Sequence, residues 1–258
     1  METLLRNIRL TIQYDGTGFL GWQRQARGPT VQEELEKALS VMTGETVSVI
    51  GSGRTDAGVH ALGQVANFKT KSNIPLSGLV KGLNSLLPRQ IAVTEALEVP
   101  LEFHAIRDAV AKEYEYRIIS AKTRQPLWEN RAWVITRPLD LEGMQAAATH
   151  LTGTHDFSSF MASGSQVKTT VRTIHTLEVS CSIDECFPPV KGQHYQITVA
   201  ADGFLRYMVR NITGILVEVG LGKRDPDAVR HVLKATDRCR AGPTAPAQGL
   251  YLMRVMYK

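Results

Sequence analysis

The sequence predicts an α+β protein in which helices flank a mostly antiparallel sheet. Two observations favour this class. Segments with the alternating apolar and polar residues of half-buried strands occur in runs, and they outnumber the single helical crossovers that a parallel sheet would need. The chain also has 258 residues, 43% of them apolar, and both parts contain the same mixture of strands and helices. We therefore expect two similar α/β halves.

The first elements are defined by periodicity and by caps. A strand is predicted over residues 8–14, where apolar and polar residues alternate up to an Asp-Gly turn. A glycine-containing loop, GTGFLGWQRQARGP, follows at 16–29. The first helix is predicted to begin after Thr30, because Thr30 and Glu33 form a capping box. It is predicted to end at Gly44, where the helical spacing of apolar residues stops.

The later elements follow from the same two periods. In the first half we expect strands at 46–50 and 64–68 and a helix at 76–87, which Pro88 stops. In the second half we expect three strands, two helices and one loop. The strands are at 113–119, 177–183 and 195–199, the helices at 144–151 and 204–219, and the loop at 185–192.

The boundary between the halves is predicted between Val99 and Val110. No Ser- or Gly-rich linker separates independent modules there. We therefore predict an N-terminal half, residues 1–105, that carries the glycine-rich turn around Asp56, and a C-terminal half, residues 106–258.

Composition limits the possible functions. The chain has 30 Lys and Arg against 25 Asp and Glu, a formal net charge of +5 and an isoelectric point near 9.2, which favours a polyanionic partner without proving one. Cys181, Cys186 and Cys239 are too scattered to indicate disulfides or a zinc site, and His155-Asp156 is expected to form a turn or cap. The cysteine pattern therefore implies no metal, and because no membrane span or secretory leader is evident, we expect a cytoplasmic protein.

The segment GSGRTDAGVHALGQVANF, residues 51–68, is the most informative part of the chain. A dinucleotide-binding fingerprint is excluded because its third glycine position holds Asp56, and a P-loop is excluded because Val59-His60 stands where lysine is required. A carboxylate in such a cradle would also repel phosphate. The turn is therefore expected to present Asp56 as a nucleophile or a base.

Arg54 stands two residues before Asp56. A guanidinium at contact distance lowers the pKa of a carboxyl group by about 1–3 units, so Arg54 is expected to keep Asp56 ionised. The alternative is an aspartate that caps a turn beside a surface arginine, which is the commoner role of an arbitrary Arg-Thr-Asp sequence.

The segment around Asp56 resembles the active-site motif of the tRNA pseudouridine synthase A family. Seven further segments match that family in order along nearly the whole chain. They are YDGTGFLGWQRQ at 14–25, TVQEELEKAL at 30–39, FHA at 103–105, KEYEYRI at 112–118, GTHDFSSF at 153–160, FLRYMVRNITG at 204–214 and GLYL at 249–252. One stretch departs, because the family usually has Arg-Phe-Ser after FHA where this chain has residues 106–108, IRD. No role is carried to those positions.

The resemblance implies roles for five residues. The catalytic nucleophile falls on Asp56, its partner arginine on Arg54 and the active-site tyrosine on Tyr114. Arg210 is implied to support the aspartate, and Leu250 to contact the target base.

Two of these positions also have structural explanations. Tyr114 shares a strand face with Tyr116, as a core aromatic would, whereas the resemblance implies that it stacks on the target uracil and transfers a proton. Arg206 and Arg210 lie four residues apart and are expected to project from one face of the predicted helix. They are either a solvated pair or contacts to phosphate and to Asp56.

Arg24 belongs to a stretch that interleaves aromatic, amide and cationic side chains. Trp22, Gln23, Gln25 and Arg27 surround it. This composition suits contacts to an RNA backbone, and we count Arg24 among the substrate-binding candidates. A buried tryptophan anchor explains Trp22 equally well.

On this resemblance we expect a pseudouridine synthase fold with a central basic cleft. The implied activity is the isomerisation of uridine to pseudouridine in the anticodon stem-loop of tRNA, by a homodimer that holds tRNA through shape and phosphate contacts. The reaction gains and loses no atoms, so no cofactor is needed. Two alternatives stay open, namely a non-catalytic RNA-binding protein on the same scaffold and a nucleotide hydrolase with Asp56 as its nucleophile.

Overall fold

The computed structural model describes residues 4–164, 167–183 and 192–258. The predicted loop at 185–192 falls outside these residues except for its last position, and Cys186 falls outside them too. The chain divides into two compact units. The first contains the residues up to Val110 together with Tyr251–Lys258, and the second contains Ala111–Leu250. The domain limits expected above, 1–105 and 106–258, stay a prediction.

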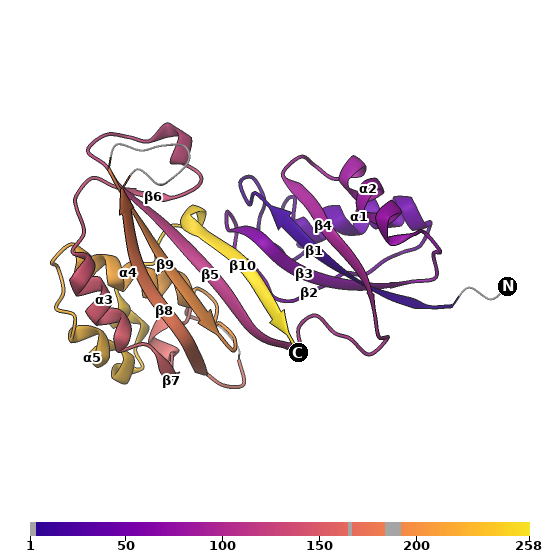
Figure 1. Cartoon of the computed structure of the whole chain (residues 1–258). Helices are drawn as coiled ribbons and strands as arrows, with labels where there is room; N and C mark the ends of the chain where they lie inside the picture. Colours follow the sequence, from indigo (N-terminus) through magenta and orange to yellow (C-terminus); the bar gives the residue numbers. More distant parts are fainter. Residues whose placement is uncertain (1–3, 165–166, 184–191) are drawn as a thin grey trace. The chain divides into compact units, whose positions relative to one another are not determined.

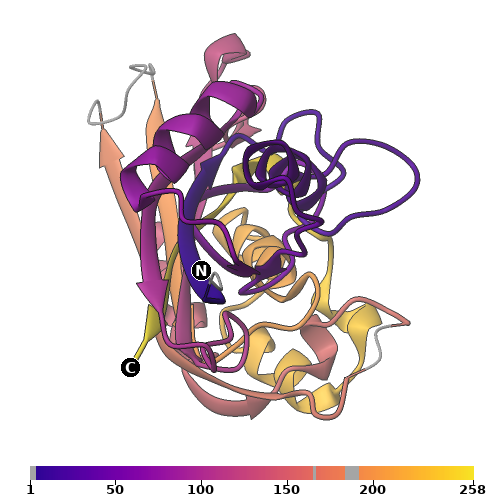
Figure 2. The same cartoon turned by 90° about the vertical axis from the view of Figure 1, so that its right-hand side faces the viewer.

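The first unit is a sheet with two helices on one face. Strand order is β4-β1-β3-β10, with β2 added to β3, and every pair is antiparallel except the short parallel pairing of β10 with β3. Helices α1 and α2 lie side by side on the same face of this sheet (Figures 1 and 2). The strands are β1 (Arg6–Tyr14), β2 (Ile50–Gly51), β3 (His60–Thr70), β4 (Ile91–Val99) and β10 (Leu250–Tyr257), and the helices are α1 (Val31–Thr43) and α2 (Leu76–Leu86).

The second unit repeats this plan with three helices. Strand order is β5-β9-β8-β7, all antiparallel, with a short parallel pairing of β6 with β5. Helix α4 is buried almost all round, since eleven of its thirteen residues are buried. The strands are β5 (Ala109–Ser120), β6 (Trp133–Ile135), β7 (Gly153–Asp156), β8 (Val171–Ile183) and β9 (Gln193–Ala201), and the helices are α3 (Leu141–Thr149), α4 (Met208–Gly220) and α5 (Ala228–Ala235).

The α+β class with a mostly antiparallel sheet is confirmed. In each unit, the apolar residues that alternate along the strands turn toward the helices and form the core. Ile8, Leu10 and Ile12 of β1 are completely buried, as are Leu35 and Leu39 of α1. Among the helices in the described part of the chain, none is both long and apolar enough to cross a bilayer.

The ends of α1 are where the capping residues predict them. Thr30 has extended backbone, and its side-chain oxygen accepts a hydrogen bond from the backbone N–H of Glu33. Gly44 adopts left-handed φ of 70° and closes the helix. The Glu33 carboxylate binds Lys37 along the helix at 3.2 Å.

Two predicted elements are corrected. The strand expected at 46–50 is present only from Ile50 onward. Residues 46–49 lead into β2 as irregular chain. The helix expected at 204–219 begins at Met208, because Tyr207 has a left-handed φ of 66° that an α-helix cannot include. Arg206 therefore lies in the turn before α4, not one helical turn below Arg210.

Candidate active site

Asp56 lies in the turn that joins β2 to β3. The backbone N–H of Val59 donates to the Asp56 carbonyl at 3.1 Å, and Gly58 has a left-handed φ of 78° that reverses the chain. The Asp56 side chain is half-buried, whereas Arg54 is exposed. The turn thus presents both residues near the protein surface.

Hydrogen bonds fix the backbone on both sides of Arg54. The Gln64 amide donates to the Gly53 carbonyl at 3.1 Å, and the Trp22 backbone N–H donates to the Thr55 carbonyl at 3.1 Å. The Thr55 hydroxyl also bonds the Tyr14 hydroxyl at 2.8 Å. A main chain held on both sides of Arg54 has little freedom, so the side chains of this turn start from a fixed position.

The loop that precedes α1 packs directly against this turn. A Cβ at Gly21 would collide with the Thr55 carbonyl oxygen, and a Cβ at Gly51 would collide with the Trp22 indole. Only glycine allows these two approaches. Trp22 is 2% exposed, so it is a buried anchor and does not offer its ring to RNA.

Buried polar side chains beneath the turn are neutral and paired. Gln64 is completely buried, and its side-chain oxygen accepts from the Ser52 hydroxyl at 2.6 Å and from the Val65 N–H at 3.1 Å. Burial raises the pKa of Tyr14 to about 12, against the smaller lowering effect of its bonds to Thr55 and Gln64. Tyr14 is therefore a neutral support for the turn at physiological pH, and it is not a base.

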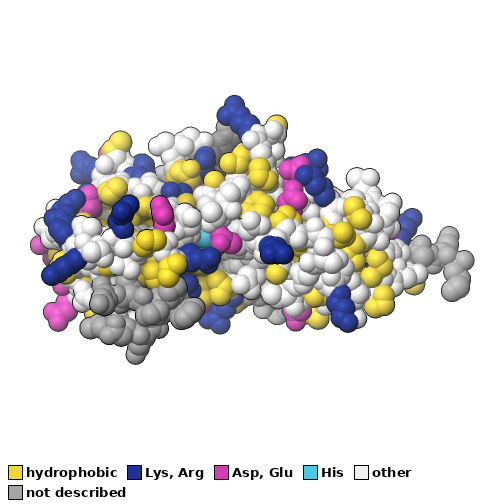
Figure 3. Space-filling view, turned by 90° about the horizontal axis from the view of Figure 1, so that it is seen from above, with side chains coloured by type: hydrophobic (Ala, Val, Ile, Leu, Met, Phe, Trp, Pro, Cys, Tyr) yellow, Lys and Arg dark blue, Asp and Glu magenta, His cyan; other side chains and the backbone are white. Residues whose placement is uncertain are grey.

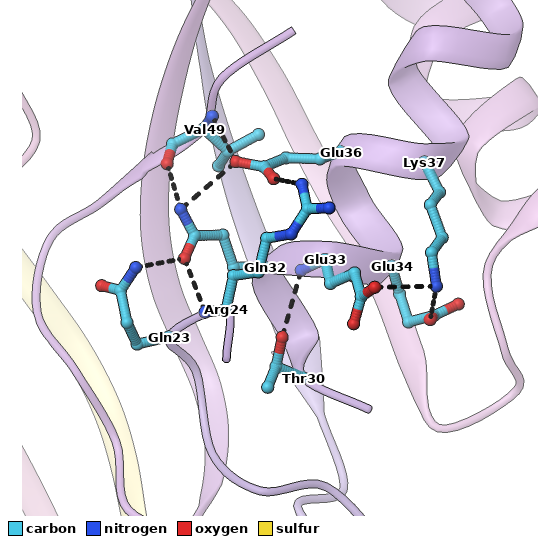
Figure 4. Close-up of polar contacts among 9 residues, drawn as sticks. All are labelled: Gln23, Arg24, Thr30, Gln32, Glu33, Glu34, Glu36, Lys37 and Val49. Atoms are coloured by element: carbon cyan, nitrogen blue, oxygen red, sulfur yellow. Dashed lines mark hydrogen bonds and ion pairs between the residues drawn. The ribbon is translucent and has the colours of Figure 1, made fainter. Parts of the chain in front are cut away.

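Arg54 and Arg24 are both joined to the region around α1. The Arg54 Nε donates to the Gln23 side-chain oxygen at 3.2 Å. One Arg24 guanidinium nitrogen lies 3.3 Å from a Glu36 oxygen, while most of the Arg24 side chain is exposed (Figure 4). Both arginines keep donors available to a ligand, since a guanidinium has five.

Tyr114 belongs to the second unit, on β5. It is 8% exposed, and its ring meets the edge of Phe204 with centroids 5.1 Å apart. Its neighbour on the same strand face, Tyr116, is fully buried and donates its hydroxyl to the Pro246 carbonyl at 2.7 Å. The Tyr116 pKa is raised by burial. The structure thus distinguishes a core tyrosine, Tyr116, from one that keeps a small exposed fraction.

Arg210 and Arg206 come together on one aromatic ring. Their guanidinium carbons lie 4.8 Å and 4.9 Å from the centroid of Tyr207. The Arg210 Nε also donates to the Ala245 carbonyl at 2.8 Å, so Arg210 is held on two sides, whereas Arg206 is exposed. Tyr207, whose left-handed backbone is unusual for a residue with a side chain, thus has both guanidinium groups at its ring.

Leu250 lies at the start of β10 and is 6% exposed. The residue before it is Gly249, and the Tyr116 ring lies so close that a Cβ at this position would collide with it. The backbone at Gly249, next to Leu250, is therefore packed closely against the Tyr116 ring.

No metal centre is formed by the described residues, among which no group of three or more His, Cys, Asp or Glu side chains could hold an ion. Asp156 accepts a hydrogen bond from the Ser158 N–H at 2.9 Å. This is the turn role that the sequence predicts for the His155-Asp156 pair.

The sequence did not reveal the supports of the Asp56 turn, namely Tyr14, Gln64 and Gln23. One signal was available for Gln64, because an amide at a buried position of an apolar strand needs a polar partner. Gln23 carried no such signal, since it lies in an irregular loop.

Comparison with known proteins gives consistent matches along the chain. Residues 10–107 and 147–258 match the family model described as tRNA pseudouridine synthase. Proteins named tRNA pseudouridine synthase A from Thermoanaerobacter pseudethanolicus and Geotalea uraniireducens are each 47% identical over 98% of this chain and 100% of their own length. The protein of that name from Acetivibrio thermocellus is 46% identical over the same shares.

Proposed function

Because the chain belongs to the tRNA pseudouridine synthase family, it is an isomerase that converts uridine in tRNA to pseudouridine, and we propose that Asp56 is the nucleophile of this reaction. The observation that supports this role is the Asp56 turn itself. Its carboxylate is half-buried, and hydrogen bonds hold the main chain at Gly53, Thr55 and Asp56. A nucleophile held in this way loses little freedom on reaching the attacking geometry.

The reaction needs few groups. The bond from N1 of uracil to C1′ of ribose breaks, the base turns, and C5 bonds to C1′. One proton leaves C5 and one is gained by N1, so no atoms are added or lost overall. A carboxylate, a proton carrier and a pocket that retains the detached base are sufficient.

We assign the other roles as follows. Tyr114 stacks on the target uracil and carries a proton through its hydroxyl, a combination that suits a tyrosine whose ring is packed and which keeps 8% of its surface exposed. Arg210 stabilises the Asp56 carboxylate, and Leu250 contacts the base. Arg54 keeps Asp56 ionised and fills the space that the extruded nucleotide leaves.

Arg24 and Arg206 are proposed to bind tRNA phosphates. Both side chains are exposed, and guanidinium groups match phosphate geometry. The substrate region is proposed to be the anticodon stem-loop. A homodimer is also proposed, on the resemblance alone, and light scattering of the purified protein tests it by its mass. A cytoplasmic location is proposed as well.

One set of assays tests the nucleophile against both alternatives. The wild-type protein and Asp56→Asn are incubated with an unmodified tRNA transcript in the presence of a chelator, and the products are mapped for pseudouridine and for free uracil. We expect pseudouridine from the wild type, none from Asp56→Asn, and tRNA binding by both. Free uracil or hydrolysed nucleotide would indicate the hydrolase instead. Binding without any product from the wild type would indicate a non-catalytic RNA-binding protein.

A further inference from the structure

We propose that Gln32 is a positioning residue that aims Arg54 through a relay of two side-chain amides, its own and that of Gln23. The proposal rests on the role assigned to Arg54 above. Gln32 projects from the first turn of α1 and is half-buried. Figure 4 shows its amide at the centre of a set of polar contacts that joins α1, the loop before it and the segment that leads into β2.

Backbone groups fix the direction of the Gln32 amide. Its oxygen accepts from the Arg24 backbone N–H at 2.9 Å, and its nitrogen donates to the Val49 backbone carbonyl at 2.9 Å. A backbone N–H can only donate and a backbone carbonyl can only accept. If the Gln32 amide were rotated by 180°, its nitrogen would face the Arg24 N–H and its oxygen would face the Val49 carbonyl. Neither contact could then be a hydrogen bond, so only one orientation of the amide is satisfied.

This orientation is passed on to Gln23. The Gln32 oxygen also accepts from the Gln23 amide nitrogen at 2.7 Å, so the nitrogen of Gln23 must face Gln32. The Gln23 oxygen then faces the other way, where it accepts from the Arg54 Nε at 3.2 Å. Arg54 can only donate, so every hydrogen bond of the relay is donated in the same direction, from the Arg54 guanidinium toward the Val49 carbonyl.

Glu36 reinforces the inner end of the relay. One of its oxygens accepts from the Gln32 nitrogen at 3.2 Å and from the Val49 N–H at 3.1 Å, and the other lies 3.3 Å from Arg24 (Figure 4). The Glu36 side chain is 12% exposed. A largely buried carboxylate with three donors is a firm anchor, because leaving it unpaired would be costly.

The relay matters because Arg54 is exposed and has a long side chain. Such a side chain samples many rotamers unless a partner holds it. A fixed acceptor for Nε leaves the two terminal nitrogens of Arg54 pointing in one defined direction. We expect the loss of this acceptor to slow the chemical step by about tenfold or more, since small misplacements of catalytic groups have effects of this size.

Two variants break the relay at different points. Gln32→Met removes its inner amide at similar side-chain volume, and Gln23→Met removes its outer amide on an exposed loop, where folding is least affected. Asn84→Leu is the matched control. Asn84 also joins a helix to a strand through both ends of its amide, donating to the Val93 carbonyl at 2.8 Å and accepting from the Val93 N–H at 2.7 Å, but it has no connection to Arg54.

Two measurements are made on each variant. The first is the single-turnover rate of pseudouridine formation together with the Kd for tRNA. The second is the solvent exchange of the Arg54 Nε proton, followed by NMR of protein with labelled arginine. We expect both relay variants to lower the rate about tenfold or more, to leave Kd within about twofold, and to speed the exchange of the Arg54 proton, while Asn84→Leu changes neither.

Unchanged exchange of the Arg54 proton in both relay variants would overturn the relay. Faster exchange with an unchanged rate would also overturn the proposal, because the relay would then hold Arg54 without contributing to the rate. Arg54→Ala separates the two failures, because a large loss of rate in Arg54→Ala with normal rates in both relay variants contradicts only the relay.

Discussion

At the scale of single residues, the Asp56 turn depends on polar side chains buried beneath it. Tyr14 and Gln64 come from the paired strands β1 and β3, and each reaches a backbone or hydroxyl group of the turn. Neither group is charged at neutral pH, so the support does not compete electrostatically with the Asp56 carboxylate. Because this scaffold is neutral, the charges near Asp56 are those of its own carboxylate and of the arginines.

The raised pKa of Tyr14 predicts a loss of stability at alkaline pH. Between pH 10 and about 12 the unfolded chain ionises this tyrosine while the folded chain keeps its proton. The unfolded state then binds fewer protons, so the free energy of unfolding falls by about 1.4 kcal/mol per pH unit from this residue alone. Below pH 10 the effect is absent.

Tyr14→Phe isolates this contribution. Urea unfolding at pH 8, 9, 10 and 11 should show a shallower alkaline decline for the variant than for the wild type. Some decline should remain, because burial also raises the pKa of Tyr116 and Tyr257. Parallel curves for the two proteins over this range would contradict the assignment.

At the scale of secondary-structure elements, α4 is fixed by a close approach to the chain that precedes β10. The methyl group of an alanine at position 214 would collide with the Pro243 carbonyl oxygen. Two hydrogen bonds tie the same segment to Arg210, from Ala245 N–H to the Arg210 carbonyl at 3.0 Å and from Arg210 Nε to the Ala245 carbonyl. The helix that carries Arg210 therefore depends on a glycine one turn further on.

Two glycine substitutions test this packing. Gly214→Ala should destabilise the protein by about 1–3 kcal/mol and lower its activity, because backbone must move to make room. Gly78→Ala in α2 is the control, since its nearest neighbour is the Ile74 side chain at 3.2 Å, which can adjust. It should be neutral or stabilising by up to about 1 kcal/mol. Equal changes in Tm for both variants would argue against the close approach.

Elements with strong local signals could be predicted from sequence, and those decided by distant contacts could not. The limits of α1 follow from Thr30 and Gly44, which act on their own neighbours. The apolar spacing predicts a start of α4 at residue 204, but the left-handed backbone of Tyr207 delays the helix to Met208. Strand β10 carries little alternation, and its pairing with β3 at Tyr251 and Leu252 is a contact between residues far apart in the sequence.

At the scale of the whole molecule, the positive charge can be followed on one face. On the face shown in Figure 3, Lys and Arg side chains are interspersed with acidic and apolar ones. With a formal net charge of +5, long-range attraction for tRNA is moderate, and individual arginines should contribute visibly to the salt dependence of binding.

The proposed phosphate contact of Arg24 predicts a change in that salt dependence. Arg24→Ala should weaken tRNA binding and reduce the slope of log K against log salt by about one. Lys81→Ala, an exposed cation on α2 to which no role is assigned, should leave the slope unchanged. Filter binding between low and physiological salt measures both slopes. Equal slopes for Arg24→Ala and the wild type would exclude the contact.

The candidate site was predictable to the extent that its residues lie in contiguous motifs. Asp56, Arg54 and Tyr114 are assigned from motifs that can be compared letter by letter. The relay of Gln32 and Gln23 was not predictable, because it joins a helix, a loop and the segment that leads into β2 through side chains with no shared period. Hydrogen bonds between amides leave no pattern in the sequence of one chain.

The whole assignment depends on the carboxylate of Asp56, and the single-turnover rate of pseudouridine formation by Asp56→Asn is the decisive quantity. Asp108→Asn is the control, because Asp108 is an exposed aspartate of the same unit whose oxygen accepts from the His104 N–H, a contact that asparagine retains. We predict a loss of at least about a thousandfold for Asp56→Asn with tRNA binding intact, and a rate within about twofold of wild type for Asp108→Asn. Pseudouridine formation by Asp56→Asn at near the wild-type rate would mean that another group is the nucleophile.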